Sequence, residues 1–382
     1  GKPSGVFVDN EVGAVMRYVP SYTKEDIHHS LTLAIQECLK YGLTSVHDMG
    51  IDEEDYSVYN ELLEKNALPI RVYAAIGGDG ELWQRFLSSG PFTDPSRRRL
   101  TVRAIKMYID GALGSRGAAL IGPYSDDPGN RGLTVNSLEA IRMVTSEALR
   151  HGFQVCTHAI GDRGNNIVLN AYEQAMQQNP STVRDARLRI EHAQVIEPSD
   201  IPRFRKLGVI PGMQPTHCTS DMYWAQARLG SSRIRGAYAW RSLLIDGNIV
   251  PGGSDSPVES PNPLFGFYAA ITRQDHSGIP RDVEDVRRTF QLSAEGIKDS
   301  SDFNNGWYAD QKMTREEALR SFTIWGAYAE FAENEKGSIE KGKLADLVIL
   351  SKDIMVIPPR EILSTEVAAT IVGGKIEYSS NK

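Results

Sequence analysis

The sequence has no excess of positive charge and no long apolar segment. Its 382 residues include 42 Lys and Arg against 49 Asp and Glu, which gives a formal net charge of −7. Because nucleic-acid-binding proteins usually carry a basic stripe, this balance argues against a nucleic-acid partner. No apolar run approaches the roughly 20 residues that span a bilayer, and the N-terminus lacks a secretory hydrophobic region. We therefore expect a cytoplasmic protein without a membrane partner.

Cysteine is also scarce. Cys38, Cys156 and Cys218 are far apart in the sequence and form no C-x-x-C pair. This spacing excludes a disulfide framework and favours a reducing compartment. The hydrophobic share of 41% is that of an ordinary globular protein. The length is sufficient for one domain of barrel size and a smaller one.

Seven short apolar segments, each followed by polar or Gly-rich residues, recur along the chain. They are 43–50, 70–78, 102–112, 153–162, 188–194, 207–215 and 248–256. Such runs are typical of parallel strands that are buried on both faces. Amphipathic segments lie between them, for example 24–42 and 137–152. The pattern predicts a (β/α)8 TIM barrel with one unit uncounted. The alternative, a doubly wound open sheet, lacks a G-x-G-x-x-G motif after the first segment.

The composition changes near the C-terminus. We assign residues 1–335 to the barrel domain and residues 336–382, which are punctuated by Gly and Lys, to part of a small β-sandwich domain. Within the first domain, the polar segment 275–313 is predicted to be an exposed insertion. Segment 314–332 is predicted to form one helix that starts with a capping box at Thr314.

Four polar residues stand at the carboxyl ends of four different predicted strands: Lys106, His158, His192 and Asp255. Active sites of TIM barrels are built at this end, so we expect these side chains to converge. Neutral imidazole and carboxylate groups are good ligands for zinc and related divalent ions. A lysine ammonium is a poor ligand. A site that depresses the pKa of the amine would allow carbon dioxide to carboxylate it into an anionic ligand.

Each of these residues has a structural alternative. A single histidine after an apolar strand is usually a hydrogen-bonded structural residue. Lys106 alone suits an ion pair, for example with Asp110, and Asp255 in a Gly-Ser-Asp-Ser-Pro segment suits a turn or a helix cap. The joint occurrence of four candidates on four strand ends favours the metal site.

Five segments carry a resemblance to a known family. They are IKMYIDGALGSR (105–116), THAIGDRGNN (157–166), RIEHAQ (189–194), GSDSPVESPNPLFGFYAAITR (253–273) and GSIEKGKLADLVIL (337–350). Together they resemble the amidohydrolase superfamily, and more narrowly its amidohydrolase 3 branch of metal-dependent hydrolases, which includes N-substituted formamide deformylases. The resemblance covers essentially the whole chain except the predicted insertion.

The resemblance implies a metal-dependent hydrolase that cleaves a C–N bond of a small amide, formamide or cyclic amide. Lys106 is similar to the carboxylated lysine that bridges two metals. His158 and His192 would hold the more exposed metal, while Asp255 would bind the buried metal and act as general base. One or two divalent metals per chain are implied, with zinc as the first choice and iron or manganese as alternatives.

The same motifs, and the segment after the sixth apolar run, supply further candidates. We expect six residues to support the ligands or to contact the small-molecule substrate, with structural salt bridges as the alternative for the first four: Asp110, Arg116, Asp162, Arg163, His217 and Asp221. The resemblance also suggests a homodimer.

One family feature is absent. The family's first barrel strand ends in H-x-H, and this sequence contains no H-x-H. His28 and His29 are adjacent on a predicted helix and so diverge by about 100°. His47 matches the family's second strand instead. Since the first residue is Gly1 and not Met, we expect the first strand to lie upstream, and the isolated chain to be weak or inactive.

Two other functions remain open at this stage. Fold does not dictate function, so a catalytically inactive barrel that acts as a regulatory or binding scaffold is the alternative. Hydrolysis of esters or phosphoesters would use the same metal chemistry, because pocket shape selects the leaving group.

Overall fold

The fold is given by a computed structural model, which describes residues 11–78, 80–276 and 305–380 together with the isolated positions 5, 7 and 288. Most of the predicted insertion, 275–313, lies outside these residues.

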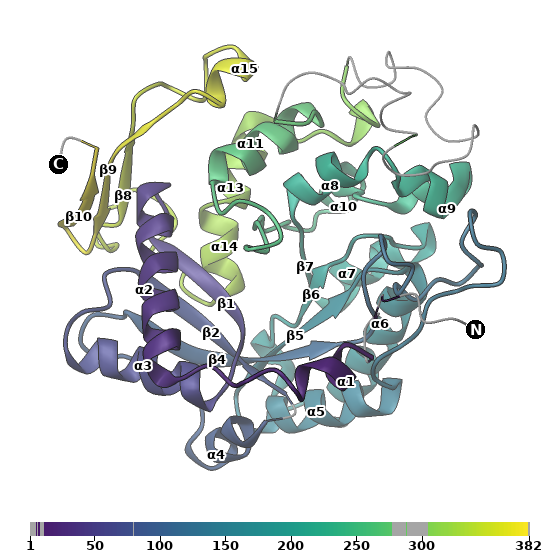
Figure 1. Ribbon diagram of the computed structural model, residues 1–382, viewed down its shortest axis with the longest axis horizontal. Coiled ribbons are helices and arrows are strands. Elements are labelled where there is room, and N and C mark those ends of the chain that lie inside the picture. The colour runs from purple at the N-terminus through teal and green to yellow at the C-terminus, as the bar shows by residue number, and fades with distance from the viewer. Residues whose placement is uncertain are drawn as a thin grey trace.

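The main sheet is parallel and curled, with helices on its outside (Figure 1). Its strands, in spatial order, are β1 (Ser45–Ile51), β2 (Arg71–Gly77), β4 (Leu100–Tyr108), β5 (Gln154–Ala159), β6 (Arg189–His192) and β7 (Ile210–Gly212). A short strand, β3 (Phe92–Thr93), pairs antiparallel with β4. The sequential order of parallel neighbours is that of a TIM-barrel-like fold and excludes a doubly wound sheet.

Six of the seven predicted strands are confirmed. The seventh segment, 248–256, contributes only a parallel bridge between Met213 and Gly252. Its backbone is held partly by a helix end instead of a strand neighbour, because the Gly252 N–H donates to the carbonyl of Ser321 over 3.0 Å. The segment lies beside the end of β7 because the Met213 N–H donates to the carbonyl of Pro251 and the Gly253 N–H donates to the carbonyl of Met213.

Helices alternate with the strands, as the amphipathic segments predict. The helix before β1 and those between the strands are α2 (Lys24–Lys40), α3 (Glu53–Glu64), α4 (Glu81–Ser89), α5 (Leu138–Arg150), α6 (Asp162–Gln178) and α7 (Ile201–Leu207). Outside this series the described part of the chain also contains α1 (Val12–Met16), α8 (Pro215–Asp221), α9 (Ala225–Arg233), α10 (Trp240–Ile245), α11 (Pro263–Thr272) and α15 (Pro359–Ile362), besides two helices in segment 314–332. Thr23 starts α2 with a capping box, which supplies partners for the free backbone N–H groups there.

The prediction of a single helix over 314–332 is wrong. The structure has two helices, α13 (Arg315–Ser321) and α14 (Ile324–Ala329). The predicted capping box at Thr314 is confirmed.

Tertiary contacts account for this break. Thr323 lies between the two helices with φ −134° and ψ −98°, outside the helical region. Just before it, the Ser321 hydroxyl donates to the carbonyl of Val250 over 2.6 Å. A Cβ on Gly266 would lie only 2.3 Å from the Phe322 ring, so that ring fills the space beside α11. The residues at the end of α13 are thus held by contacts with neighbouring segments. The pattern of apolar residues in the sequence does not predict these contacts.

The C-terminal residues form a second sheet, antiparallel and in the order β10-β9-β8. Its strands are β8 (Leu347–Leu350), β9 (Val367–Val372) and β10 (Lys375–Ser379), and they lie beside α2 (Figure 1). The Thr370 hydroxyl donates to the carbonyl of Leu39 over 2.6 Å, which joins β9 to that helix. The expected C-terminal β structure is confirmed, whereas the domain boundary at residue 335 stays a prediction. None of the helices in the described part of the chain is long and apolar enough to cross a membrane.

A buried ion pair joins the barrel to the segment before β8. Arg71, at the start of β2, donates from Nε and Nη2 to the two carboxylate oxygens of Asp346, over 2.6 Å and 2.9 Å. The side chains are only 3% and 5% exposed. Removing one partner of such a pair leaves an uncompensated buried charge.

We therefore expect Asp346→Ala to lower the free energy of unfolding by about 3–5 kcal/mol. Denaturant unfolding of the purified chain measures this. The double variant Arg71→Met with Asp346→Leu should lose less than the single variant, because it leaves no buried guanidinium without a partner. A loss below about 1 kcal/mol in the single variant, as for an exposed pair, would contradict the buried character of this contact.

Candidate metal centre

The register of the parallel strands brings the predicted residues to one edge of the sheet. Lys106 on β4 pairs with Cys156 on β5. His158 is level with Tyr108 at the end of β4, and His192 ends β6 opposite Ala159. Since the carboxyl ends of parallel strands lie together, these residues meet at the end where barrel active sites are built.

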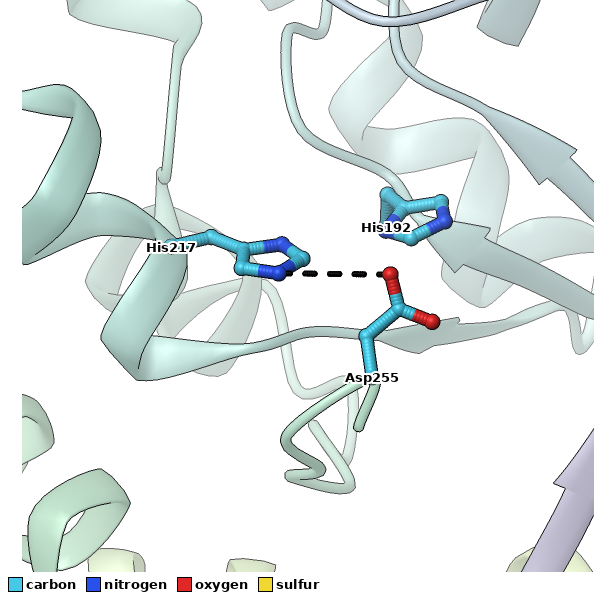
Figure 2. Close-up of side chains that lie close together, drawn as sticks. All are labelled: His192, His217 and Asp255. Atoms are coloured by element: carbon cyan, nitrogen blue, oxygen red, sulfur yellow. Dashed lines mark ion pairs between the residues drawn. The ribbon is translucent and has the colours of Figure 1, made fainter. Parts of the chain in front are cut away.

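His192, His217 and Asp255 form a group whose ligand atoms all lie within 4.8 Å of one another (Figure 2). His217 Nε2 lies 3.9 Å from Asp255 Oδ2. The rings of His192 and His217 are nearly parallel, with centroids 5.9 Å apart. His217 belongs to α8, which follows β7, and Asp255 comes three residues after the Gly252 bridge. Three side chains from separate segments thus point toward one small volume.

His158 lies next to this group. Its ring centroid is 4.5 Å from that of His192, and the two rings are steeply inclined. Its Nε2 atom is 3.6 Å from Asp110 Oδ1. The Nε2 atoms of His158 and His217 are buried and have no hydrogen-bond partner among the described residues. Buried polar atoms are normally paired, so the orphaned Nε2 of His217, which faces Asp255, indicates a missing ligand.

The tautomer of His192 is set by a neighbour that the sequence did not identify. His192 Nδ1 lies 2.8 Å from Gln214 Oε1, an acceptor, so Nδ1 carries the proton and donates. Nε2 is then left with its lone pair available to a metal. Outer hydrogen bonds of this kind orient metal-binding histidines. His192 and Asp255 also have positive φ angles, 72° and 57°, which are unfavourable for side-chain-bearing residues and cluster at functional sites.

The three imidazoles are held neutral. Burial, with a smaller effect of the Lys106 charge, lowers the pKa of His158 to about 3. Burial lowers the pKa of His217 to about 4. The pKa of His192 lies well below its usual value, again chiefly because of burial. Metal coordination requires the neutral imidazole, so the side chains are ready to bind without losing a proton first.

Lys106 and Asp255 are shifted toward their uncharged forms. Burial lowers the pKa of the Lys106 amine, against the opposing charge of Glu191. Its Nζ atom lies 4.6 Å from the centre of the Tyr108 ring. Burial also raises the pKa of the Asp255 carboxyl, against the attraction of Lys106. Desolvation of this kind is found where acid–base chemistry is carried out.

Asp110 organises the backbone around His158. Its carboxylate accepts hydrogen bonds from the backbone N–H groups of Ala119 (2.8 Å), Ile160 (3.0 Å) and Gly161 (2.8 Å). The two motif loops are packed so closely that a Cβ on Gly161 would lie 1.9 Å from the carbonyl oxygen of Ala119. Asp110 therefore fixes the loop that carries His158 and faces that ring.

Two of the other predicted residues lie in structural contacts. Asp162 begins α6 and accepts the backbone N–H of Ile121 over 2.8 Å. Arg116 makes two hydrogen bonds of 3.1 Å to the carboxylate of Asp126. Arg163 has a buried Nε without a partner among the residues that the structure covers. For Asp162 and Arg116 these contacts are consistent with a structural role instead of a role in binding ligands or substrate.

Asp221 lies near the pocket. It accepts a hydrogen bond of 2.6 Å from the Tyr238 hydroxyl, and burial raises its pKa to about 7. A cavity of about 350 Å³ opens beside the metal group. Its lining residues are Thr216, Ser256, Pro257, Val258, Glu259, Ser260, Pro261, Phe265 and His276. The sequence predicted His217, Asp221 and Trp224 for the pocket wall, and none of the three is among these lining residues.

Comparison with known proteins identifies the family of the chain. The model of the amidohydrolase family matches residues 1–378. The chain belongs to the amidohydrolase family. It is 30% identical to the putative amidohydrolase YtcJ of Bacillus subtilis, over 100% of this chain and 67% of that protein. It is 25% identical to the N-substituted formamide deformylase of Arthrobacter pascens, over 99% of this chain and 66% of that protein.

Solved structures with a similar fold are also known. An uncharacterized metal-dependent hydrolase from Pyrococcus horikoshii OT3 superposes with a TM-score of 0.74 and 27% identity, covering 91% of this chain and 64% of that one. The atrazine chlorohydrolase TrzN from Arthrobacter aurescens TC1, at 14% identity and a TM-score of 0.58, shares the fold. The chain thus spans about two thirds of the length of the relatives it matches.

Gln214 offers a direct test of the centre. We expect Gln214→Met to weaken zinc binding by about 10–100-fold, because His192 loses the acceptor that fixes its tautomer. Competition titration with a chromogenic chelator measures the affinity. Gln36→Met, an exposed change on α2, is the matched control and should bind zinc like the unaltered chain. Equal affinities in the two variants would contradict the role of Gln214.

The metal-free amidohydrolase chain should lose stability at a higher pH than it would if its histidines had ordinary pKa values. Unfolded histidine has a pKa near 6.5, whereas burial holds that of His217 at about 4. Between these values the unfolded chain binds protons that the folded chain does not, so the free energy of unfolding falls as the pH is lowered through this window. Urea unfolding in the presence of chelator measures it. His217→Asn should reduce the slope by about one proton; an unchanged slope would show that His217 titrates normally.

Proposed function

We propose that this amidohydrolase cleaves a C–N bond in a small amide, formamide or cyclic amide, using water activated by a divalent metal. The observation that carries the proposal is the group formed by His192, His217 and Asp255, with the buried ring of His158 beside His192. The Nε2 atoms of His217 and His158 have no hydrogen-bond partner among the described residues. A binding scaffold would gain nothing from burying unpaired nitrogens, which cost free energy unless a partner completes them.

The residues fit a metal ion of the zinc type. His192, His217 and Asp255 offer two nitrogens and one carboxylate oxygen, a ligand set that zinc, iron and manganese accept, with zinc as the first choice. His158 adds a third nitrogen beside them. Lys106, if its amine is carboxylated, supplies an anionic oxygen from β4. The set therefore provides ligands for one metal position and contributes to a second.

A bound divalent ion supplies a nucleophilic water at neutral pH and polarises the carbonyl group of the substrate. Asp255 then has the acid–base role. Its side chain is 41% exposed, and its raised pKa makes it a stronger base than an ordinary aspartate. It accepts a proton from the attacking water and returns it to the departing nitrogen. Gln214 keeps His192 in the tautomer that this site needs.

The type of bond rests on the relatives and on the pocket. A relative that matches almost the whole chain is an N-substituted formamide deformylase, which points to a formyl or small acyl group on a substituted nitrogen. The cavity beside Asp255 provides room for the substituent. Ester and phosphoester hydrolysis would need the same groups, so the substrate panel that tests the proposal has to include both.

Loss of a metal-binding histidine should abolish metal binding and turnover together. We expect His192→Ala and His217→Ala to lose the bound metal and to reduce turnover of any accepted substrate at least about 100-fold, since the ligand set is no longer complete. The measurements are metal content by mass spectrometry and hydrolysis of a panel of N-substituted formamides, amides, cyclic amides, esters and phosphoesters.

The control is His151→Ala, which removes an exposed histidine at the end of α5. It should keep metal and turnover. Unaltered rates in His192→Ala would refute the proposed mechanism. Turnover of esters without turnover of any amide would keep the metal centre and refute the C–N assignment.

A further inference from the structure

The cavity beside the metal centre is continuous with its proposed ligands. Thr216 immediately precedes His217, and Ser256 immediately follows Asp255; both line the cavity. A molecule that fills the cavity therefore ends next to the groups proposed to carry out the reaction. At about 350 Å³ the cavity is at the small end of the range for ligand sites, sufficient for a ring with one short substituent.

One side of the cavity suits a flat apolar group. Pro257, Pro261 and Phe265 contribute apolar surface. The Phe265 ring stacks on the His276 ring, with centroids 4.9 Å apart and an interplanar angle of 12°. Aromatic faces bind other rings by stacking and by removing their apolar area from water. An aromatic or cyclic substituent would be bound here more favourably than a flexible polar chain.

The charge on the cavity wall is negative. Glu259 lines it, is half-buried, and makes no ion pair with any residue of the described ranges. Neither Lys nor Arg occurs among the described lining residues. Asp255 lies at one end of the cavity, and the Glu259 charge is close enough to Asp221 to contribute to the raised pKa of that carboxyl. The wall therefore attracts a positive charge and repels an anion.

A buried hydroxyl adds a second polar contact. Thr216 is only 7% exposed, and its Oγ1 atom is buried without a hydrogen-bond partner in the described part of the chain. Because buried hydroxyls are normally paired, this atom indicates a ligand group that completes it. The cavity wall thus offers two hydrogen-bond acceptors, the neutral hydroxyl of Thr216 and the charged carboxylate of Glu259.

We propose that this cavity binds a cyclic or aromatic group that carries an ammonium, and that Glu259 is the specificity-determining residue for that positive charge. The inference deepens the proposed hydrolase function, because it assigns cationic N-substituted amides as the preferred substrate class. Glu259 forms the ion pair, Thr216 accepts a hydrogen bond, and the Phe265 wall covers the ring. Charge-assisted contacts of this type are stronger than neutral ones.

Two probes of the same shape test the charge preference. Benzylammonium and benzyl alcohol have the same ring and differ in the charged group. We expect the unaltered chain to bind benzylammonium at least about tenfold more tightly than the alcohol at neutral pH and low salt. Ligand-observed NMR or calorimetry measures both affinities, and added salt should weaken only the binding of benzylammonium.

Glu259→Gln should lower benzylammonium affinity about tenfold and leave benzyl alcohol unaffected. Glu259→Asp, which keeps the charge on a shorter side chain, should retain most of the preference. Thr216→Val should weaken both probes. Glu366→Gln, an exposed change at the far sheet, is the matched control and should bind both probes normally.

Equal affinity for the two probes, no binding of either, or an unchanged preference in a folded Glu259→Gln variant would overturn the inference. Its failure is distinguishable from failure of the hydrolase proposal, because probe binding is measured without turnover. Charge-selective binding that depends on Glu259 supports the inference even if no amide is hydrolysed. In that case the cavity assignment holds and the proposed reaction does not.

Discussion

The register of three parallel strands is the constraint on which the site depends. β4, β5 and β6 are hydrogen-bonded so that Lys106, His158 and His192 come to the same edge of the sheet. A slip of one residue in any of these strands would move its side chain to the other face. The burial of His158 and His192 follows from this alignment, whereas α8 and the segment after Gly252 bring His217 and Asp255 to the same edge. The close packing of Gly161 against Ala119 keeps the alignment fixed.

The site stores unfavourable free energy that a bound ion would release. Two imidazole nitrogens are buried without partners, and His192 and Asp255 have left-handed backbone conformations. Desolvation and strain of this kind are costly in a fold that does not need them. The Asp110 carboxylate accepts a hydrogen bond from the loop that follows His158, and Gln214 is hydrogen-bonded to the His192 ring. The structure is therefore organised around binding a cation, and the amidohydrolase relatives agree with that interpretation.

Local patterns predicted much of the fold, and the site less completely. Six apolar runs form parallel strands, as predicted, because strands buried on both faces consist almost entirely of apolar residues. The prediction of one helix over 314–332 was wrong, because Ser321 and Phe322 contact residues that are distant in sequence and the chain leaves the helical conformation there. His217 was predicted for the pocket wall, whereas its ring lies in the ligand group; Pro215 at the start of α8 was the available signal for the turn that carries it there. The homodimer, the cytoplasmic location and the insertion over 275–313 stay predictions.

The most direct test of the account is the position of the metal. A crystal structure of the zinc-loaded chain, with anomalous data collected at the zinc edge, locates the ion without assuming any activity. The account predicts a peak bounded by the side chains of His192, His217 and Asp255, with Gln214 still hydrogen-bonded to His192. A peak elsewhere, or a zinc-loaded chain in which the His217 ring points away from Asp255, would contradict it.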